Sequence, residues 1–308
     1  MCVAVLMLVA TSAVAELQNV TVGDGIRIRA SFTESMPHLQ IPVLGAHRGG
    51  ALLWPENTVV AFTEAIKRWP QILLESDACL TKDGQVVLLH DGSVDRTTNG
   101  KGKVTDLTLE EIKRLDAGYN FTQDSGKTFP YRGKGLTVPT LAEALAATPN
   151  QHWVIEFKRT PGIVPPVIAE VQKANALGRV WLASFKPEFM KEARQLAPNG
   201  KFCFDFENGM AMLKTLRSGD WDAYHPEAKM LSLGMEMVDQ FKLTKDEVAK
   251  LRAKGIVFQL HTPNTREAMV KALDLGANSI LTDQPELLQQ ILDERRASAS
   301  APQSGTTP

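Results

Sequence analysis

Eight short apolar runs alternate with segments of helical periodicity between residues 43 and 282, and this alternation is the strongest constraint on the fold of the 308-residue chain. Eight βα units in succession predict a TIM-type (β/α)8 barrel. An open doubly wound sheet is disfavoured because no G-x-G-x-x-G turn follows any of the runs. The expected parallel strands are residues 43–47, 72–80, 153–158, 180–185, 201–206, 223–225, 256–261 and 279–282.

One further extended run, residues 85–90, follows residues 72–80 after a turn of only four residues. A parallel connection needs a crossover of about a dozen residues, so these two runs should form an antiparallel hairpin. Residues 92–135 come next; they are polar and rich in Gly, Thr, Lys and Asp. We expect this segment to be a small insertion that packs over the barrel. The expected helix N-caps are Asn57, Thr108, Thr140, Thr244 and Asn264.

The two ends of the chain differ in composition from the predicted barrel domain, residues 42–295. Residues 1–15 end in an Ala-x-Ala pattern after a short apolar run, which predicts a signal peptide and export to the periplasm or beyond. No Lys or Arg precedes that run, which is unusual for such a signal, and cytoplasmic residence is the alternative. Residues 16–41 form a lead-in, and residues 296–308 are small and polar, as in a disordered tail.

The charge balance and the cysteine content exclude some classes of protein. The formal net charge of -1 disfavours a nucleic-acid-binding protein, which would normally carry an excess of basic residues. The apolar run near the start is shorter than the roughly 20 residues that a membrane span needs. Cys79 and Cys203 lie in apolar runs, where buried free thiols are expected, but a disulfide between them remains open.

Three carboxylates and a lysine fall on two of the expected strands. Glu75 and Asp77 are two residues apart, so their side chains share one face, and Glu156 and Lys158 repeat this spacing. Two like charges on an apolar strand are costly to bury unless a cation lies between them, and oxygen ligands suit Mg²⁺ or Ca²⁺. The alternatives are solvent-exposed carboxylates for the first pair and an ion pair with a neighbouring strand for the second.

Two histidines and an arginine are expected at the same end of the barrel. His47 ends the first strand and His90 ends the return strand of the hairpin. Histidine titrates near neutral pH, so one imidazole can accept a proton while the other donates one. Arg48 presents a planar fork of donors that suits a phosphate group. Together with a metal ion and a lysine, these residues indicate a site for displacement at phosphorus.

These residues belong to a series of motifs that resembles the glycerophosphodiester phosphodiesterase family, over residues 43–286. In chain order the motifs are His47-Arg48-Gly49-Gly50, Pro55-Glu56-Asn57-Thr58, Glu75-x-Asp77, Leu80-Thr81-Lys82-Asp83-Gly84, Val87-x-x-His90-Asp91, Asp95-Arg96-Thr97-Thr98-Asn99-Gly100, Val138-Pro139-Thr140-Leu141, Ile155-Glu156-Phe157-Lys158, Ser184-Phe185 and Leu281-Thr282-Asp283-x-Pro285.

The resemblance implies a TIM barrel with a small insertion after the second histidine, and a phosphodiesterase activity. It implies hydrolysis of deacylated phospholipids, small-molecule glycerophosphodiesters, to an alcohol and glycerol 3-phosphate. It leaves the oligomeric state open. The implied roles are an acid/base pair for His47 and His90, ligation of one Mg²⁺ or Ca²⁺ ion for Glu75, Asp77 and Glu156, and contact with the substrate phosphate for Arg48 and Lys158.

The chain departs from the family pattern where strand eight often carries a W-T-V-N run. The corresponding residues are Phe258-Gln259-Leu260-His261, so the preference for a head-group alcohol stays open. His261 is either a substrate contact or a strand-end histidine with a local hydrogen bond, and we weigh the two equally. His225 is a minor candidate for specificity, whereas His38 and His152 receive no role.

Two other functions compete with the implied one. A lysophospholipase D-like or sphingomyelinase D-like enzyme would share the fold but needs an apolar rim that touches lipid, and the polarity of residues 92–135 argues mildly against it. An inactive barrel that binds phosphate or sugar would lack a catalytic group, and here the set is complete. An amidohydrolase barrel is disfavoured because the first strand ends in His-Arg and not in His-x-His.

Overall fold

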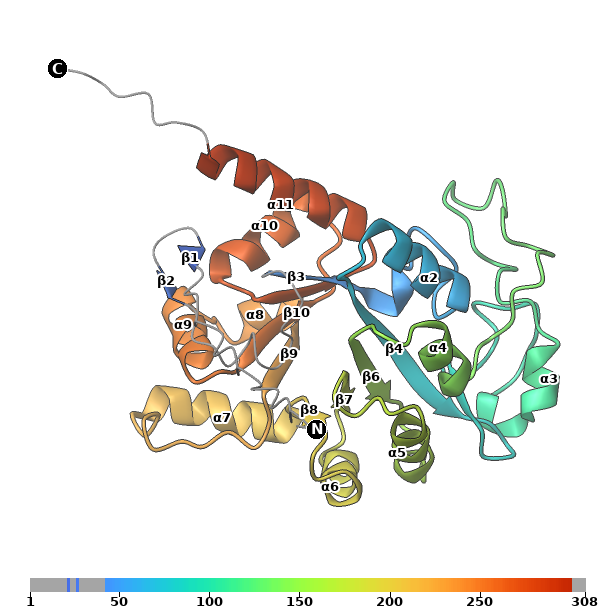
Figure 1. Cartoon of the computed structure of the whole chain (residues 1–308), viewed down its shortest axis with the longest axis horizontal. Helices are drawn as coiled ribbons and strands as arrows, with labels where there is room; N and C mark the ends of the chain where they lie inside the picture. The colour runs from blue at the N-terminus through green and yellow to red at the C-terminus, as the bar shows by residue number, and fades with distance from the viewer. Residues whose placement is uncertain (1–20, 23–25, 28–41, 301–308) are drawn as a thin grey trace, which may run out of the picture.

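The computed structural model describes residues 21–22, 26–27 and 42–300 (Figure 1). The predicted signal peptide lies outside these ranges, as do most of the lead-in and residues 301–308. Two short lead-in strands, β1 (Thr21–Val22) and β2 (Ile26–Arg27), pair with each other in antiparallel fashion. Among the helices formed by the described residues, none is long and apolar enough to span a membrane.

The described residues contain the predicted barrel of eight parallel strands, which is nearly closed. The strands are β3 (Val43–Ala46), β4 (Leu73–Leu80), β6 (Trp153–Phe157), β7 (Val180–Ala183), β8 (Lys201–Phe202), β9 (Met230–Gly234), β10 (Val257–His261) and β11 (Ser279–Thr282). Their order around the sheet is β8-β7-β6-β4-β3-β11-β10-β9. A single bridge between Cys203 and Met230 brings the two edge strands β8 and β9 together.

One predicted strand is wrong. Residues 223–225 form an irregular segment, and the sixth parallel strand is β9. Tyr224 stacks on Trp221, and its carbonyl oxygen accepts a hydrogen bond from Lys254 Nζ at 2.9 Å, close to the amino end of β10. His225 therefore lies at the end of the barrel opposite to the expected site. The segment that replaces W-T-V-N lies on β10, which is the seventh parallel strand in chain order and not the eighth.

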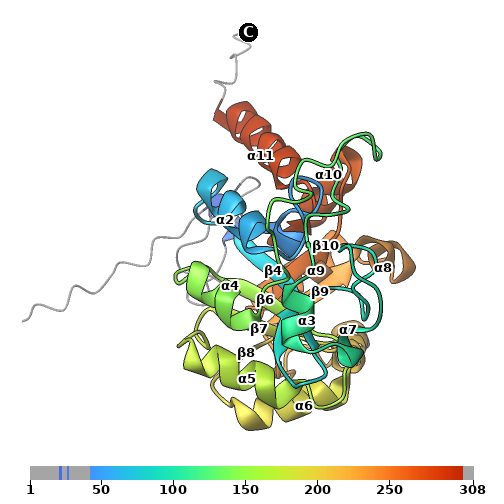
Figure 2. The ribbon, with the colours of Figure 1, turned by 90° about the vertical axis from the view of Figure 1, so that its right-hand side faces the viewer.

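Helices surround the barrel, as Figures 1 and 2 show from two directions. They are α2 (Val59–Arg68), α4 (Leu141–Ala147), α5 (Val164–Lys173), α6 (Pro187–Leu196), α7 (Phe206–Ser218), α8 (Met235–Gln240), α9 (Lys245–Ala253), α10 (Arg266–Leu275) and α11 (Pro285–Ser300). Because α11 extends to Ser300, the prediction of a disordered tail is wrong over residues 296–300.

The capping signals predicted the N-caps of five helices, and three of these predictions are confirmed. Thr108, Thr140 and Thr244 are N-caps in complete capping boxes, as expected. The predictions for Asn57 and Asn264 are wrong, because the N-cap in each case is the threonine that follows. A threonine hydroxyl caps a helix well, and this leaves both asparagine side chains free for contacts elsewhere.

The interior of the barrel is filled at its amino-terminal end by one layer of apolar side chains. The layer takes one residue from each strand or the position directly after it: Val43, Leu73, Val154, Trp181, Cys203, Met230, Val257 and Leu281. Side chains two and four residues further along the same strands point to the same side, so they lie in the interior nearer the carboxyl end. In TIM barrels the carboxyl end carries the active site.

The predicted hairpin is confirmed, and the insertion packs on it. β5 (Val86–Leu88) pairs antiparallel with β4, with Ala78 opposite Leu88. The insertion includes η2 (Val104–Asp106) and α3 (Leu109–Lys113), and α3 lies in front of the strands in Figure 2. Ile112 packs in a cluster with Cys79, whereas Cys203 lies inside the barrel. Both cysteines are buried and free, so no disulfide joins them.

Candidate active site

The three predicted carboxylates line the interior of the barrel at its carboxyl end. Glu75 and Asp77 follow Leu73 on the inner face of β4, and Asp77 lies opposite Glu156 of β6 in the register of the sheet. Only 4% of Glu75 and 1% of Asp77 is exposed, which excludes the alternative of solvent-exposed carboxylates for this pair. Burial of two like charges two residues apart requires positive partners nearby.

Arg48 and Lys158 supply positive charge to this cluster. Lys158 Nζ lies 2.9 Å from Asp77 Oδ1 and 3.1 Å from Glu156 Oε2. Arg48 Nε lies 3.5 Å from Asp77 Oδ2. Burial acts to raise the pKa of Asp77, but the charges of Lys158 and Arg48 outweigh it and hold the pKa below its usual value. Lys158 thus forms the ion pair with a neighbouring strand that the alternative predicted, through Asp77 of β4, and it also pairs with Glu156 of its own segment.

Glu75 is less well compensated than Asp77. Burial and the nearby charge of Asp77 raise the pKa of Glu75 to about 7. Its Oε2 accepts a hydrogen bond of 2.8 Å from the backbone N–H of Arg48, which has a left-handed backbone with φ of 53°. Left-handed conformations of residues other than glycine are uncommon and often occur at functional sites. The cluster therefore has a buried carboxylate that lacks a full positive partner.

The residues present fit a divalent cation by their chemistry. Within residues 42–300 no three His, Cys, Asp or Glu side chains are gathered closely enough to hold a metal ion as they stand, and Lys158 bridges Asp77 and Glu156. Carboxylate oxygens are nevertheless the ligands that Mg²⁺ and Ca²⁺ prefer, and a cation beside Glu75 would lower its raised pKa.

His47 lies directly after β3, in η1 (His47–Gly49), and is held by Asp283 at the end of β11. The distance from His47 Nδ1 to Asp283 Oδ1 is 2.7 Å, and Asn264 Nδ2 donates to the other oxygen of Asp283 at 2.6 Å. His47 Nε2 lies 3.9 Å from Glu75 Oε2. Burial acts to lower the pKa of His47, but Glu75 and Asp283 outweigh it and raise the pKa.

His90 has the same kind of partner in a more open position. Its Nδ1 lies 2.8 Å from Asp91 Oδ1, and 36% of its side chain is exposed, against 16% for His47. Arg96 donates to Asp91 at 2.7 Å and holds the pKa of that carboxyl down at about 2. Arg96 also donates to Glu56 at 2.6 Å, so His90 is supported by a surface network and not by the barrel interior.

All seven predicted site residues therefore meet at one end of the barrel, but their supporting residues were not predicted. Asn57 has a left-handed backbone, donates from Nδ2 to Asp77 at 3.0 Å and accepts from Ser76 Oγ at 2.6 Å. The supporting residues Glu56, Asn57, Asp91, Arg96, Asn264 and Asp283 fix the orientation of the predicted ones. Five of these six lie in the motifs that carry the family resemblance, which was the available signal.

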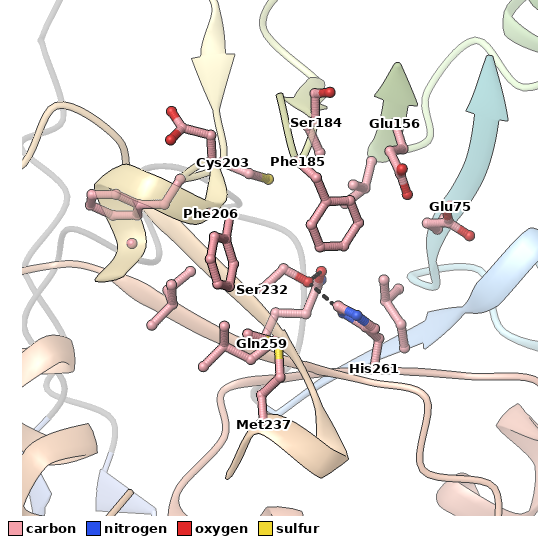
Figure 3. A pocket seen from close by; sticks show the side chains of 18 of the residues that line it. Glu75, Glu156, Ser184, Phe185, Cys203, Phe206, Ser232, Met237, Gln259 and His261 are labelled. Carbon is pink, nitrogen blue, oxygen red and sulfur yellow. Dashed lines mark hydrogen bonds between the residues drawn. The ribbon is translucent and has the colours of Figure 1, made fainter. Parts of the chain in front are cut away.

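A pocket of about 800 Å³ of space between atoms, its open mouth included, adjoins the cluster (Figure 3). His261 lines it, with Nδ1 3.0 Å from Ser232 Oγ, which donates to Gln259 Oε1 at 2.9 Å. Burial lowers the pKa of His261 to about 4. His261 therefore makes the local hydrogen bond that one of its two predicted roles requires. It also lines the pocket, and its lowered pKa favours the neutral imidazole.

Comparison with known proteins agrees with this arrangement. Residues 47–287 match the model of the glycerophosphoryl diester phosphodiesterase family, so the fold and the site define a barrel hydrolase acting on phosphoric diesters. The chain belongs to the glycerophosphoryl diester phosphodiesterase family. This family generally depends on a divalent metal ion.

Individual relatives cover most of the chain. A glycerophosphodiester phosphodiesterase from Caldanaerobacter subterraneus subsp. tengcongensis is 32% identical over 253 residues, which are 80% of this chain and 96% of the relative. One from Bacillus subtilis is 32% identical over 260 residues, covering 80% and 85%.

Solved structures show the same fold. A glycerophosphoryl diester phosphodiesterase domain from Mycobacterium tuberculosis has a TM-score of 0.70 at 22% identity and covers 82% of this chain and 100% of that domain. An Oleispira antarctica phosphodiesterase, solved with its product sn-glycerol-3-phosphate, has a TM-score of 0.65 at 23% identity, covering 82% and 97%.

Proposed function

We propose that this protein hydrolyses glycerophosphodiesters to an alcohol and sn-glycerol 3-phosphate with the help of one divalent cation. The observation that carries the proposal is the meeting of two aspartate-backed histidines with three carboxylates, an arginine and a lysine at the barrel mouth. The curated relatives named glycerophosphodiester phosphodiesterases support this substrate class, as does the Oleispira antarctica structure that holds the product.

Glu75, Asp77 and Glu156 would hold the cation, either Mg²⁺ or Ca²⁺. Such an ion polarises a phosphoryl oxygen and stabilises the charge that develops on it. Lys158 bridges two of these carboxylates, so it would either share them with the ion or turn its ammonium group toward the phosphate. In both arrangements its positive charge stays beside the reacting phosphorus.

Arg48 would bind the phosphate from the end of the first strand. Its Nη1 donates to Glu56 at 3.1 Å and its Nε faces Asp77, so the guanidinium plane is fixed before substrate arrives. A fixed planar fork of donors matches two phosphate oxygens without a reorganisation cost at the moment of reaction. Asn57 orients Asp77 from the same loop and so keeps the carboxylate at a constant distance from Arg48.

His47 and His90 would be the acid and the base. With Nδ1 facing a carboxylate in both residues, Nε2 is the nitrogen left to exchange a proton with the substrate. One imidazole takes the proton of the attacking hydroxyl, and the other donates a proton to the leaving alcohol. The attacking hydroxyl belongs either to water or to the glycerol of the substrate itself, through a cyclic product.

The test is turnover of glycerophosphocholine and glycerophosphoethanolamine, first with EDTA and then with Mg²⁺ or Ca²⁺ restored. We expect glycerol 3-phosphate to be released only when a metal ion is present. Equal turnover with and without chelator would disprove metal dependence. A folded protein that binds phosphate esters but hydrolyses none would support the inactive binding barrel instead.

We also propose that the protein is exported. The support is the apolar run before an Ala-x-Ala pattern in residues 1–15. Fractionation of cells that express the full chain with a C-terminal tag tests this: we expect a shortened chain outside the cytoplasm. A full-length chain that stays with the cytoplasmic fraction contradicts export.

A further inference from the structure

We propose that Arg96 is a positioning residue that couples two groups of the active site, because its guanidinium joins the partner of His90 to the partner of Arg48. The inference rests on the proposed function, in which His90 transfers a proton and Arg48 binds the phosphate. Arg96 lies in the polar insertion, six residues after His90. The insertion therefore contributes a side chain to the organisation of the site and does more than pack over the barrel.

The guanidinium of Arg96 makes paired contacts with each of two carboxylates. Its Nε donates to Asp91 Oδ2 at 2.7 Å and its Nη2 donates to Asp91 Oδ1 at 3.3 Å. Its Nη1 donates to Glu56 Oε2 at 2.6 Å and its Nη2 donates to Glu56 Oε1 at 2.8 Å. Paired contacts of this kind fix both the distance and the relative plane of the two groups, which a single ammonium group cannot do. Arg96 thus sets the position of Asp91 relative to Glu56.

Each of these carboxylates holds one of the residues proposed to act on the substrate. Asp91 Oδ1 lies 2.8 Å from Nδ1 of His90. Glu56 Oε1 accepts a hydrogen bond from Nη1 of Arg48 at 3.1 Å. The contacts form a continuous chain, which runs in order through His90, Asp91, Arg96, Glu56 and Arg48. Since His90 follows β5 and Arg48 follows β3, this chain of contacts joins two groups that come from different strands.

The separation of these two groups matters because the phosphorus of the substrate must lie within reach of both. A misplacement of about 1 Å in a group that acts on the substrate can lower a rate by about a hundredfold. The side chain of Arg48 is 16% exposed and also faces Asp77, whereas the side chain of His90 is 36% exposed. His90 is therefore the less confined of the two, and Arg96 ties it to the more confined Arg48.

The backbone of Arg96 is held by the rest of the insertion. Asn120 Nδ2 donates to the carbonyl oxygen of Arg96 at 3.0 Å and to that of Thr98 at 2.9 Å. One residue before Arg96, Asp95 Oδ1 accepts a hydrogen bond from the N–H of Gly102 at 2.9 Å. These contacts fasten the turn that carries Arg96 from both sides. The side chain therefore starts from a fixed point and loses less freedom when it binds both carboxylates.

A second arginine with a similar ion pair separates positioning from simple stabilisation of the fold. Ion pairs of exposed side chains contribute little to stability, and the side chain of Arg96 is 46% exposed. Arg217 is 45% exposed and donates to Glu247 at 2.6 Å and 3.3 Å. Because α7 begins beside the pocket, Arg217 near its last residue lies toward the other end of the barrel. Arg217 is therefore a matched control for the loss of an exposed arginine pair.

The first test compares Arg96→Ala and Arg96→Lys with wild type on glycerophosphocholine, with the divalent cation present. We expect Arg96→Ala to lower kcat about tenfold to a hundredfold, because His90 is no longer tied to Arg48. Arg96→Lys should restore only part of this loss, since an ammonium group binds as a point charge. Arg217→Ala should leave kcat and KM unchanged. Circular dichroism checks that all three variants are folded.

Two further substitutions separate the two halves of the chain of contacts. Asp91→Asn changes the half that ends at His90 and should lower kcat, while the inhibition constant of sn-glycerol 3-phosphate changes less than about twofold. Glu56→Gln changes the half that ends at Arg48 and should raise that inhibition constant about threefold to tenfold. Adding Arg96→Ala to Glu56→Gln should raise it less than about twofold further, because both substitutions break the same contact.

The outcomes distinguish failure of this inference from failure of the proposed function. If wild type hydrolyses glycerophosphocholine and Arg96→Ala behaves as Arg217→Ala does, the inference is overturned and the proposed function stands. Wild-type rates in Arg96→Lys also overturn it, as do effects of Arg96→Ala and Glu56→Gln on the inhibition constant that multiply in full. If wild type hydrolyses no glycerophosphodiester, the proposed function fails and the inference fails with it.

Discussion

The two sides of the barrel mouth are built from the same kind of strand ends but carry different chemistry. On the side of β3, β4 and β6, charged side chains contact one another directly, as Lys158 does with Asp77 and Glu156. On the side of β7 and β9 the corresponding positions, two residues beyond the apolar layer, carry the small side chains of Ala183 and Ser232. The fold thus determines where functional residues lie, and the side chains of each strand decide whether the position supplies chemistry or shape.

The two sides should also respond differently to substitution. Each charged side chain is held by hydrogen bonds to a partner, so removing one changes both chemistry and local order. The opposite, apolar side, where Phe185 and Leu233 line the pocket, acts through contact area, which is spread over several residues, so single changes there have smaller effects. The following substitutions test this contrast, in order of decreasing expected effect.

The largest effect should follow from removing either histidine of the charged side. His47→Ala and His90→Ala should each lower kcat by about 10²-fold to 10⁴-fold, because proton transfer is lost. Turnover of glycerophosphocholine and circular dichroism measure activity and folding. His225→Ala is the control, because His225 lies outside the mouth, and should leave kcat unchanged. A His47 or His90 variant with a near-normal rate disproves the acid/base assignment.

A smaller loss should follow from changing the partner of a histidine. Asp283→Asn keeps the shape but removes the charge that helps to raise the pKa of His47, so that pKa should fall. We expect kcat to decrease on the order of tenfold to a hundredfold, because the imidazole is less well oriented. NMR titration of the imidazole against pH checks the direction. An unchanged or higher pKa of His47 in this variant contradicts the assigned contact.

His261 lies between the two sides and should affect stability more than catalysis. Its pKa of about 4 in the folded state lies below its ordinary value of 6.5, so the unfolded chain binds more protons between these values. The stability that depends on neutral His261 is fully present above pH 6.5 and is lost as pH falls from 6.5 toward about 4. The loss between pH 7 and pH 5 should be roughly 1–2 kcal/mol.

Urea unfolding of wild type and His261→Asn at the two pH values measures this loss. We expect the variant to lose less free energy of unfolding on acidification than wild type. His225→Asn is the matched histidine control and should behave as wild type does. Identical pH dependence in wild type and His261→Asn would mean that folding does not lower the pKa of His261.

The smallest effect should follow from a substitution on the apolar side when turnover is measured with glycerophosphocholine. Phe185→Ala should change kcat/KM for glycerophosphocholine less than about twofold, since this substrate has no apolar chain that could contact the phenyl ring. Steady-state kinetics beside Leu52→Ala, at the opposite edge of the mouth, gives the comparison. A tenfold loss for Phe185→Ala would show that the apolar side takes part in binding the glycerophosphate core.

Local signals predicted much of the fold and of the site. The short turn after Leu80 predicted the antiparallel hairpin, and the complete capping boxes at Thr108, Thr140 and Thr244 are where expected. Residues 223–225 were mistaken for a strand because three apolar or aromatic residues resemble any short buried run. Tyr224 accepts a hydrogen bond from Lys254, 30 residues further along the chain, and no local pattern reports such a contact.

By itself the sequence determined the alternation of strands and helices, the barrel that follows from it, and the seven residues of the charged cluster. Only the tertiary structure decided their partners, because hydrogen bonds such as His47 to Asp283 join residues 236 positions apart. It also decided that Asn57 orients Asp77 and does not cap a helix, and that three strand ends enclose an apolar pocket. Periodicity and capping depend on neighbours along the chain, whereas a pocket depends on which strands lie side by side.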